Sequence, residues 1–378
     1  MKKILLSVFL LIAIFCFTYA QNIFFGIAPK PWTPGLGNHR IVLQIKKPAD
    51  AIRLKITWRL HDQQPDKKRF LIINAANGDT IRNVFRVSVN NEQCDIVFGP
   101  VANKGIYYFY YLPYKPDPDA GYYRYGYLSP ELPDINWVTK NHLSEKNILS
   151  ELPLATSTAM QARTGFDSFY PMEIIPTATE KKNFLLKNTD NYLLFPQDRK
   201  YPIRMKDNIP LMWLKGHQKE FKGVAAKNEY FTFQIGLYAV RSDADSVQVS
   251  FSDMKGASQT IPSSAFTCFN TGGINSFGKH FTKRVDVAEG NVQALWMGVD
   301  IPANAAPGIY KGAVLISTLG TKAKRIPLQI TVTGKYLADR GDSESWRYSR
   351  LRWLNSTIGI SDKPTEPFTN INSNGSND

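Results

Sequence analysis

The 378-residue sequence predicts an all-β fold: two β-sandwich domains joined by a partly helical linker, with a short C-terminal connector segment after the second. Apolar and polar residues alternate over residues 52–59, and again over residues 231–237 and 326–332, which is the period of a strand with one buried face. Gly, Pro and Asn separate these short segments, and no long helical period interrupts them. This pattern is typical of a sandwich or jelly roll.

The first 20 residues predict a secretory signal peptide. Lys2 and Lys3 precede an apolar run over residues 4–17, and Ala20 stands at the expected cleavage point. The run is shorter than the roughly 20 apolar residues of a spanning helix, although a short membrane anchor remains the alternative. We therefore expect export to the periplasm, cell surface or medium, with no membrane span after cleavage.

Composition divides the rest of the chain into four segments. The linker contains too many apolar side chains, among them Phe169 and Met172, to be a flexible tether. The last segment is apolar at first and then becomes a tail of Asn, Ser, Gly and Asp. The predicted segments are a first sandwich (21–136), a packed linker with short helices (137–204), a second sandwich (205–335), and a connector with a polar tail (336–378).

Charge and cysteine content exclude several classes of protein. The formal net charge is +14, but Lys and Arg are spread along the chain, which predicts an ordinary surface, with an anionic polysaccharide as the second interpretation, and not a nucleic-acid patch. Cys94 and Cys268 fall in different predicted domains, so we expect no disulfide between them. The sequence contains no zinc spacing, phosphate loop or nucleophile elbow. It therefore predicts no metal, no cofactor and no catalytic residue.

Nine of the eighteen tyrosines lie between residues 107 and 127. A tyrosine offers an apolar ring face for a sugar and a hydroxyl for hydrogen bonds, so an exposed row would suit a glycan. The alternative, which we favour for the segment 107–111, is a core strand with aromatic residues on both faces. Tyr122, Tyr123 and Tyr125, which follow a Pro/Asp turn, are the candidate carbohydrate-binding residues.

A second candidate carbohydrate site lies in the connector, where Trp346, Arg350, Arg352 and Trp353 stand close together. Guanidinium groups pair with carboxylates and stack on indoles, which suits an acidic sugar. The alternative, which we favour, is a segment that docks against a neighbouring domain.

Six segments carry a resemblance to a known family. The chain resembles the N-terminal region of secreted bacterial proteins of the glycoside hydrolase family 123 type, including their uncharacterised branch, over most of its length. The last of the six segments is the most particular. They are DSFYPMEII (167–175), YLLFPQDRKYPIRM (192–205), EYFTFQIGLYA (229–239), CFNTGG (268–273), VDIPANAAPGIYKG (299–312) and WRYSRLRWLNSTIG (346–359).

The resemblance implies sandwich domains that lead into a (β/α) barrel, where the family carries an adjacent Asp-Glu pair and uses the acetamido group of its substrate as nucleophile. This sequence ends before any barrel, which needs at least ~200 residues, so no catalytic residue is carried over. We expect an ancillary, non-catalytic region of a hydrolase acting on a polysaccharide or glycan, cut short before its barrel. The C-terminal barrel domain becomes a partner if the coding sequence continues. The alternative is a stand-alone carbohydrate-binding or cell-surface structural protein.

Overall fold

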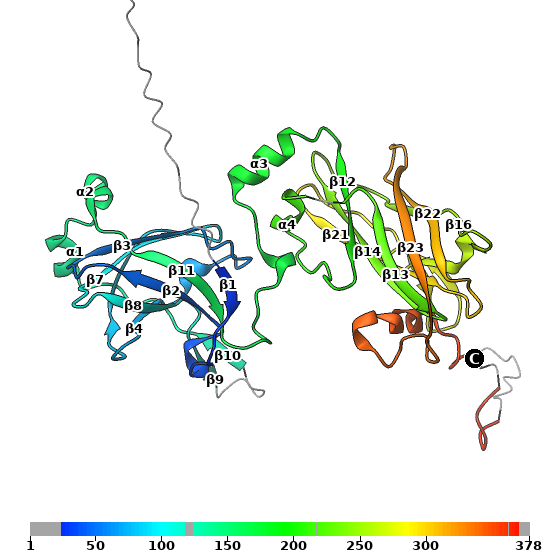
Figure 1. Ribbon diagram of the computed structural model, residues 1–378, viewed down its shortest axis with the longest axis horizontal. Helices are drawn as coiled ribbons and strands as arrows, with labels where there is room; N and C mark the ends of the chain where they lie inside the picture. The colour runs from blue at the N-terminus through cyan, green and yellow to red at the C-terminus, as the bar shows by residue number, and fades with distance from the viewer. Residues whose placement is uncertain (1–23, 118–123, 217, 362, 370–378) are drawn as a thin grey trace, which may run out of the picture. The chain divides into compact units, whose positions relative to one another are not determined.

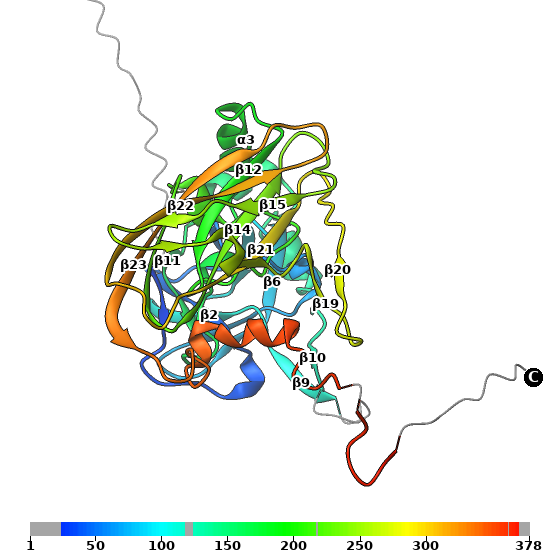
Figure 2. The same cartoon turned by 90° about the vertical axis from the view of Figure 1, so that its right-hand side faces the viewer.

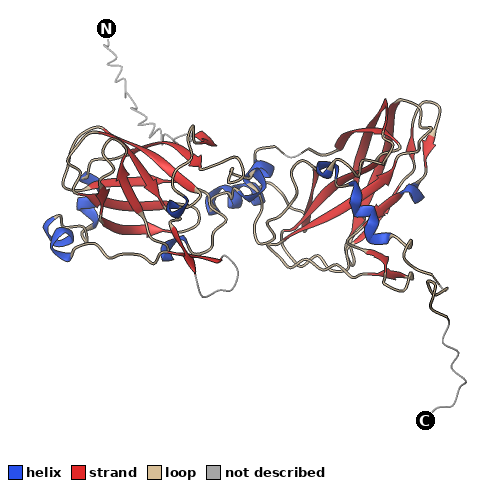
Figure 3. Ribbon diagram, turned by 90° about the horizontal axis from the view of Figure 1, so that it is seen from below, coloured by secondary structure: helices blue, strands red, loops and turns tan. Residues whose placement is uncertain are grey.

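The computed structural model describes residues 24–117, 124–216, 218–361 and 363–369. The predicted signal peptide lies outside them. The described residues form two compact units: the first contains those of 24–57 and 64–169, and the second contains those of 58–63 and 170–369. Both consist mainly of strands (Figures 1 and 3). The prediction of an all-β protein built of sandwiches is confirmed.

The first unit contains a six-stranded sheet, a three-stranded sheet and a hairpin. The larger sheet has the order β1 (Phe24–Ile27), β11 (Thr156–Ala162), β2 (His39–Ile45), β8 (Gly105–Tyr110), β4 (Leu71–Asn74) and β5 (Thr80–Ile81). The smaller has the order β3 (Ile52–Ile56), β7 (Cys94–Gly99) and β6 (Asn83–Val89). The hairpin is β9 (Tyr114–Asp117) with β10 (Arg124–Tyr127), and the 3-10 turns are η1 (Pro34–Leu36) and η2 (Pro65–Lys67).

Strand β3 shows why the alternating pattern predicted its inner face but not its outer one. Leu54 is completely buried, as its place in the pattern requires. Arg53 was expected on a charged face in water, yet it is only 9 % exposed. Its guanidinium donates to both carboxylate oxygens of Asp95, at 2.8 and 2.6 Å, and to the carbonyl of Leu149 at 2.7 Å. A bidentate ion pair lets a charged side chain leave the solvent.

Two short helices cover the outer face of the smaller sheet. They are α1 (Ile135–Lys140) and α2 (Lys146–Glu151). Their side chains Trp137, Val138 and Leu149 pack against Val97 of β7 and against Ala51, the residue before β3. The sequence predicts a linker that begins at residue 137, whereas in the structure residues 137–169 are part of the first unit. The reason is that β11 follows the helices and pairs with both β1 and β2.

The second unit is a sandwich of a four-stranded and a six-stranded sheet. The first sheet has the order β12 (Tyr192–Asp198), β14 (Tyr230–Ala239), β21 (Val292–Asp300) and β18 (Phe266–Cys268). The second has the order β13 (Phe221–Lys227), β23 (Lys324–Tyr336), β22 (Gly308–Ser317), β16 (Met254–Lys255) and β17 (Thr260–Ile261), with β15 (Gln248–Phe251) also on β22. A hairpin, β19 (Gly272–Ile274) with β20 (His280–Thr282), and the turn η4 (Ser263–Ala265) complete it.

Every residue of β14 is buried, because both faces of this strand are covered. Its inner face places Phe233 and Ile235 in a core shared with residues of β22 and β23. Most of its outer face is covered by side chains from residues 170–185 and 201–214, which include η3 (Pro171–Glu173) and α4 (Leu211–Leu214), and the connector covers Thr232. Trp213 of α4 lies over Gly236, where a Cβ would come within 2.3 Å of the indole. Side chains that follow residue 170 are thus packed against this sheet.

The segment 58–63 belongs to the second unit, where it contacts helix α3 (Ala178–Leu186). Arg59 binds both carboxylate oxygens of Glu180, at 2.5 and 2.9 Å. Thr177 and Glu180 also form a capping box at the start of α3. The hydrogen bond from Arg59, together with those from Thr177, lowers the pKa of Glu180 to about 2.

Replacing Glu180 by glutamine is expected to destabilise the second unit at neutral pH by about 1 kcal/mol, because the pair is partly exposed. The folded pKa of Glu180 is depressed, so its contribution is present above the unfolded value near 4.5 and is lost as the pH falls toward 2. Urea unfolding between pH 7 and pH 2 should show the two proteins converging in this window. Glu289→Gln, at an exposed glutamate of the same unit, should run parallel to wild type throughout. A constant offset for Glu180→Gln down to pH 2 would contradict the assignment.

Both described cysteines are buried free thiols, one in each unit. Burial raises the pKa of Cys94 and of Cys268. Within the described ranges, no helix is both long enough and apolar enough to cross a bilayer.

Candidate functional site

The predicted tyrosine site is only partly described. Tyr122 and Tyr123 lie outside the described residues. Tyr125 of β10 is 56 % exposed, and its ring meets that of Tyr114 edge-on, with centroids 4.9 Å apart. Strand β8 lies between β2 and β4. Its Tyr107 and Tyr110, and Tyr111 just after it, are each at most 3 % exposed and belong to the core, whereas Tyr108 is half-buried.

The other candidate residues lie in the second unit, in the connector that follows β23. Its first turn is fixed by Asp339, whose carboxylate accepts hydrogen bonds from the backbone of Gly341 and Ser343 at 2.9 and 2.7 Å. Hydrogen bonds from Ser343 and Gly341 lower the pKa of Asp339 to about 2. Arg340, which stands between Asp339 and Gly341, has a φ of +62°. Its carbonyl accepts a hydrogen bond from the amide of Tyr230. The turn thus joins the connector to the start of β14.

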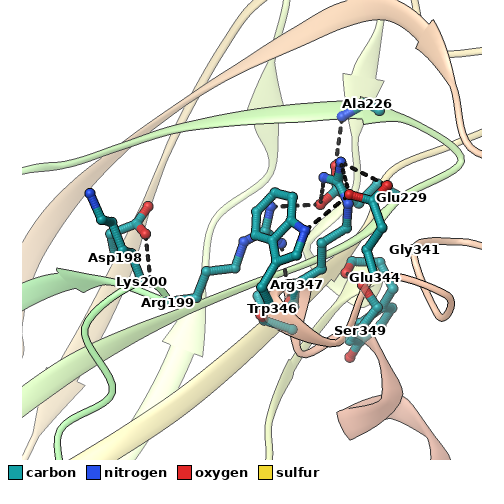
Figure 4. A network of polar contacts seen from close by, with 12 residues as sticks. Asp198, Arg199, Lys200, Ala226, Glu229, Gly341, Glu344, Trp346, Arg347 and Ser349 are labelled. Atoms are coloured by element: carbon teal, nitrogen blue, oxygen red, sulfur yellow. Dashed lines mark hydrogen bonds and ion pairs between the residues drawn. The ribbon is translucent and has the colours of Figure 1, made fainter. Parts of the chain in front are cut away.

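A buried ion cluster holds the next part of the connector (Figure 4). Glu229 is completely buried, and its Oε1 accepts from Arg199 at 2.8 Å and from Arg347 at 3.0 Å. Its Oε2 accepts from the backbone of Ala226 at 2.7 Å. The carbonyl of Arg347 also accepts from Thr232, at 2.6 Å. Glu229 therefore ties the side chain of Arg347 to the sheet, and Thr232 ties its backbone.

The two guanidinium groups of this cluster differ in their electrostatics. Burial lowers the pKa of Arg199, and the nearby Glu229 only partly offsets it. Burial also lowers the pKa of Arg347, but the carboxylates of Glu229 and Glu344 outweigh it and leave the pKa above its ordinary value. Arg199 is the more deeply buried of the two, at 4 % exposed against 8 %, and only Arg347 also donates to Glu344, at 3.3 Å, which explains the opposite signs.

Trp346 is already occupied by protein groups, although 56 % of it is exposed. The guanidinium carbons of Arg347 and Arg199 lie 4.3 and 5.1 Å from its ring centroid. Its Nε1 donates to Glu344 at 3.0 Å. These contacts hold the Trp346 ring against groups of its own unit.

The remaining three candidates gather around Asp342. Arg352 donates to both of its carboxylate oxygens, and Trp353 Nε1 donates to Oδ2 at 3.2 Å. Arg350 donates to the backbone carbonyl of Asp342 at 2.8 Å and lies over the ring of Trp353, 5.2 Å from its centroid. All of them stand on η6 (Ser349–Asn355), which follows η5 (Ser345–Arg347) and contacts β14, β19 and β21. In Figure 2 this segment, coloured orange to red, crosses below β14 and β21.

An open cleft of about 720 Å³ separates η6 from the ends of β14, β18 and β21. Two of the predicted residues, Arg352 and Trp353, line it, whereas Trp346 and Arg350 do not. The complete lining is Tyr230, Thr267, Asp300, Arg340, Arg352, Trp353, Asn355, Ser356 and Ile358.

Both arginines of the cleft are paired with carboxylates. Arg340 binds Asp300 at 2.5 Å, and Arg352 binds Asp342. Burial raises the pKa of Tyr230, so its hydroxyl stays protonated. The cleft therefore offers hydrogen-bonding groups with little net charge. Among the described residues, no group of three or more His, Cys, Asp or Glu side chains could hold a metal ion.

Sequence inspection missed Glu229, Arg199, Arg340 and Asp300. Glu229 lies 118 residues before Arg347, and Asp300 lies 40 before Arg340, so no local motif joins them. The available signal was the position of Glu229 immediately before a strand with a continuous apolar face.

Two family models match the chain. Residues 30–163 match the model described as "Glycoside hydrolase 123, N-terminal domain", and residues 268–318 match one described as "Glycoside hydrolase 123 N-terminal domain". The first match lies in the first unit and the second in the second unit. These matches confirm the resemblance to the N-terminal region of that family. No curated protein matches the sequence.

Solved structures give weaker likenesses. A family 123 glycoside hydrolase from Clostridium perfringens, studied for glycolipid glycan hydrolysis, shares 16 % identity at a TM-score of 0.31, over 39 % of this chain and 28 % of that one. A PapD-like domain of human CEP192 shares 15 % identity at a TM-score of 0.21, over 31 % and 83 %. A type I cohesin from Pseudobacteroides cellulosolvens shares 12 % identity at a TM-score of 0.18, over 31 % and 91 %. The chain thus spans less than a third of that hydrolase, and scores this low carry no functional argument.

Proposed function

We propose that this chain, with its two segments of the glycoside hydrolase 123 N-terminal type, is the supporting, non-catalytic region of a secreted protein that acts on a glycan. Its second sandwich would hold the connector in one orientation and so position a catalytic barrel after it. The observation that carries the proposal is the pairing of one buried carboxylate, Glu229, with two arginines, one of which belongs to the connector.

The cluster supports this role because a flexible tether needs no buried charges. Buried ion pairs are poor sources of net stability, but they favour one arrangement over others. The connector also carries exposed apolar side chains that a following domain could cover. Leu354 is 64 % exposed and Ile358 is 96 % exposed.

Both carboxylate oxygens of Glu229 accept hydrogen bonds from protein groups, so Glu229 is not available as a general acid.

The proposal is tested by comparing two proteins on a panel of aryl glycosides. The first is the 378-residue chain, and the second is that chain extended by the sequence that the gene encodes after codon 378. We expect no sugar release by the first and release by the second. Sugar release by the first protein, abolished by changing one of its own carboxylates, would overturn the non-catalytic role. An unrelated or absent downstream sequence would overturn the barrel partner. Secretion is tested separately, by finding whether the exported protein starts at Gln21.

A further inference from the structure

We infer that the cleft beside η6 is a binding site for a short neutral oligosaccharide, with Trp353 as its aromatic platform. This goes beyond the supporting role, because it gives the isolated chain an affinity of its own.

Trp353 has the features of a preformed sugar platform. Its side chain lines the cleft and is 53 % exposed, so a large part of the indole is open to a ligand. The hydrogen bond from Nε1 to Asp342 and the guanidinium of Arg350 near one face fix its orientation. An aromatic ring held in place can bind the C–H face of a pyranose without losing further side-chain entropy.

Planar polar groups surround the platform. Asp300 is 46 % exposed at its side chain while it pairs with Arg340. Asn355 accepts from the backbone of Ile274 through Oδ1, at 3.2 Å, and its Nδ2 has no partner among the described residues. A carboxylate, a guanidinium and an amide donor match the hydroxyl groups of a sugar, each of which both donates and accepts.

The backbone of Arg340 points to the same conclusion. Its φ of +62° is left-handed, a conformation that a non-glycine residue rarely adopts. The Asp339 turn and the hydrogen bond from Tyr230 maintain this conformation and direct the guanidinium to Asp300. The Nε of Arg340 is buried and has no hydrogen-bond partner within the described part of the chain. The turn therefore fixes a guanidinium at the wall of the cleft.

The charge balance favours a neutral ligand. Each arginine of the cleft has a carboxylate partner, so an acidic sugar would have to compete with Asp300 or Asp342. The volume of about 720 Å³ is within the usual range of about 300–1,000 Å³ for small-molecule sites. The cleft is open and its lining combines apolar area with a few polar groups, which suits the C–H faces and hydroxyl groups of a sugar.

The test is titration of the whole chain with tetrasaccharides, followed by calorimetry and ligand-observed NMR. The neutral probes are cellotetraose, chitotetraose, mannotetraose and a β-1,4-galactotetraose, and the anionic probe is tetragalacturonic acid. We expect at least one neutral probe to bind with a Kd of roughly millimolar or lower, and the affinity to be insensitive to added salt. Trp353→Ala should weaken it roughly ten-fold or more, which is about 1.4 kcal/mol, and Asp300→Asn should also weaken it.

Two exposed residues outside the cleft provide matched controls. Leu354→Ala changes the next residue of η6, and Phe166→Ala removes an exposed aromatic side chain of the first unit. Both variants should bind like wild type. The inference is overturned if no neutral probe binds, if Trp353→Ala binds unchanged, if Phe166→Ala alone loses binding, or if tetragalacturonic acid binds more tightly than every neutral probe.

Discussion

Replacing Glu229 by glutamine is expected to lower the free energy of unfolding of the second unit by about 3–5 kcal/mol. Glutamine has the same shape but no charge, so Arg199 and Arg347 would keep their positive charges in a buried site with no carboxylate at its centre. The cost comes from the two guanidinium groups left behind, and not from the loss of an attractive contact. Urea unfolding followed by tryptophan fluorescence measures it, since Trp346 lies beside both arginines.

The control uses the same substitution in a solvent-exposed ion pair. Glu220 binds Lys222 at 2.5 Å, with side chains 43 % and 55 % exposed, so Glu220→Gln should cost less than about 1 kcal/mol. Combining Glu229→Gln with Arg347→Met removes one of the two charges that lose Glu229 as a partner, and the double variant should be more stable than the sum of the single effects predicts. Equal costs for Glu229→Gln and Glu220→Gln, or strict additivity with Arg347→Met, would show that the cluster does not hold the connector.

Replacing Trp213 by alanine is expected to destabilise the second unit by about 3–5 kcal/mol. The indole is 3 % exposed, stacks on Phe195 with centroids 4.2 Å apart and planes 3° from parallel, and donates to Gln197 at 3.1 Å. It also fills the space above Gly236. Alanine would leave a cavity between α4 and the four-stranded sheet and an acceptor on Gln197 without its donor.

Trp353→Ala is the natural comparison, because it makes the same chemical change at a tryptophan that is 53 % exposed. It should shift the unfolding midpoint little, since an exposed side chain leaves no cavity. Denaturant titration of both variants, with the slope of the transition compared as well as its midpoint, distinguishes a local loss of packing from a change in the folded state. A similar stability for Trp213→Ala and wild type would mean that residues 170–214 do not contribute to the fold of the second unit.

The strands could be predicted from sequence wherever one face meets a core and the other meets water. The pattern was less informative where both faces are covered. In β14, Thr232 and Gln234 read as an exposed face, but Thr232 donates to the connector, and Gln234 accepts from the backbone of Ile203 at 2.8 Å. These polar side chains are buried because they satisfy the backbone of the segments that cover them.

The sequence could likewise predict only some of the residues of the candidate site. Trp353 and Arg352 could be found because they are neighbours in the chain and their chemistry is conspicuous. Asp300 and Arg340 could not, because strand pairing and a left-handed turn bring them together. The carbohydrate role of Tyr125, Arg352 and Trp353 stays a prediction.

The two buried thiols make each unit of the chain a reporter of its own opening. Cys94 and Cys268 are both shielded from solvent, and burial keeps both thiols protonated in the folded protein, so an alkylating reagent can react only with molecules that have locally or globally unfolded. Because one thiol lies in each unit, labelling that is resolved by mass measures the unfolding of the two units independently in a single sample.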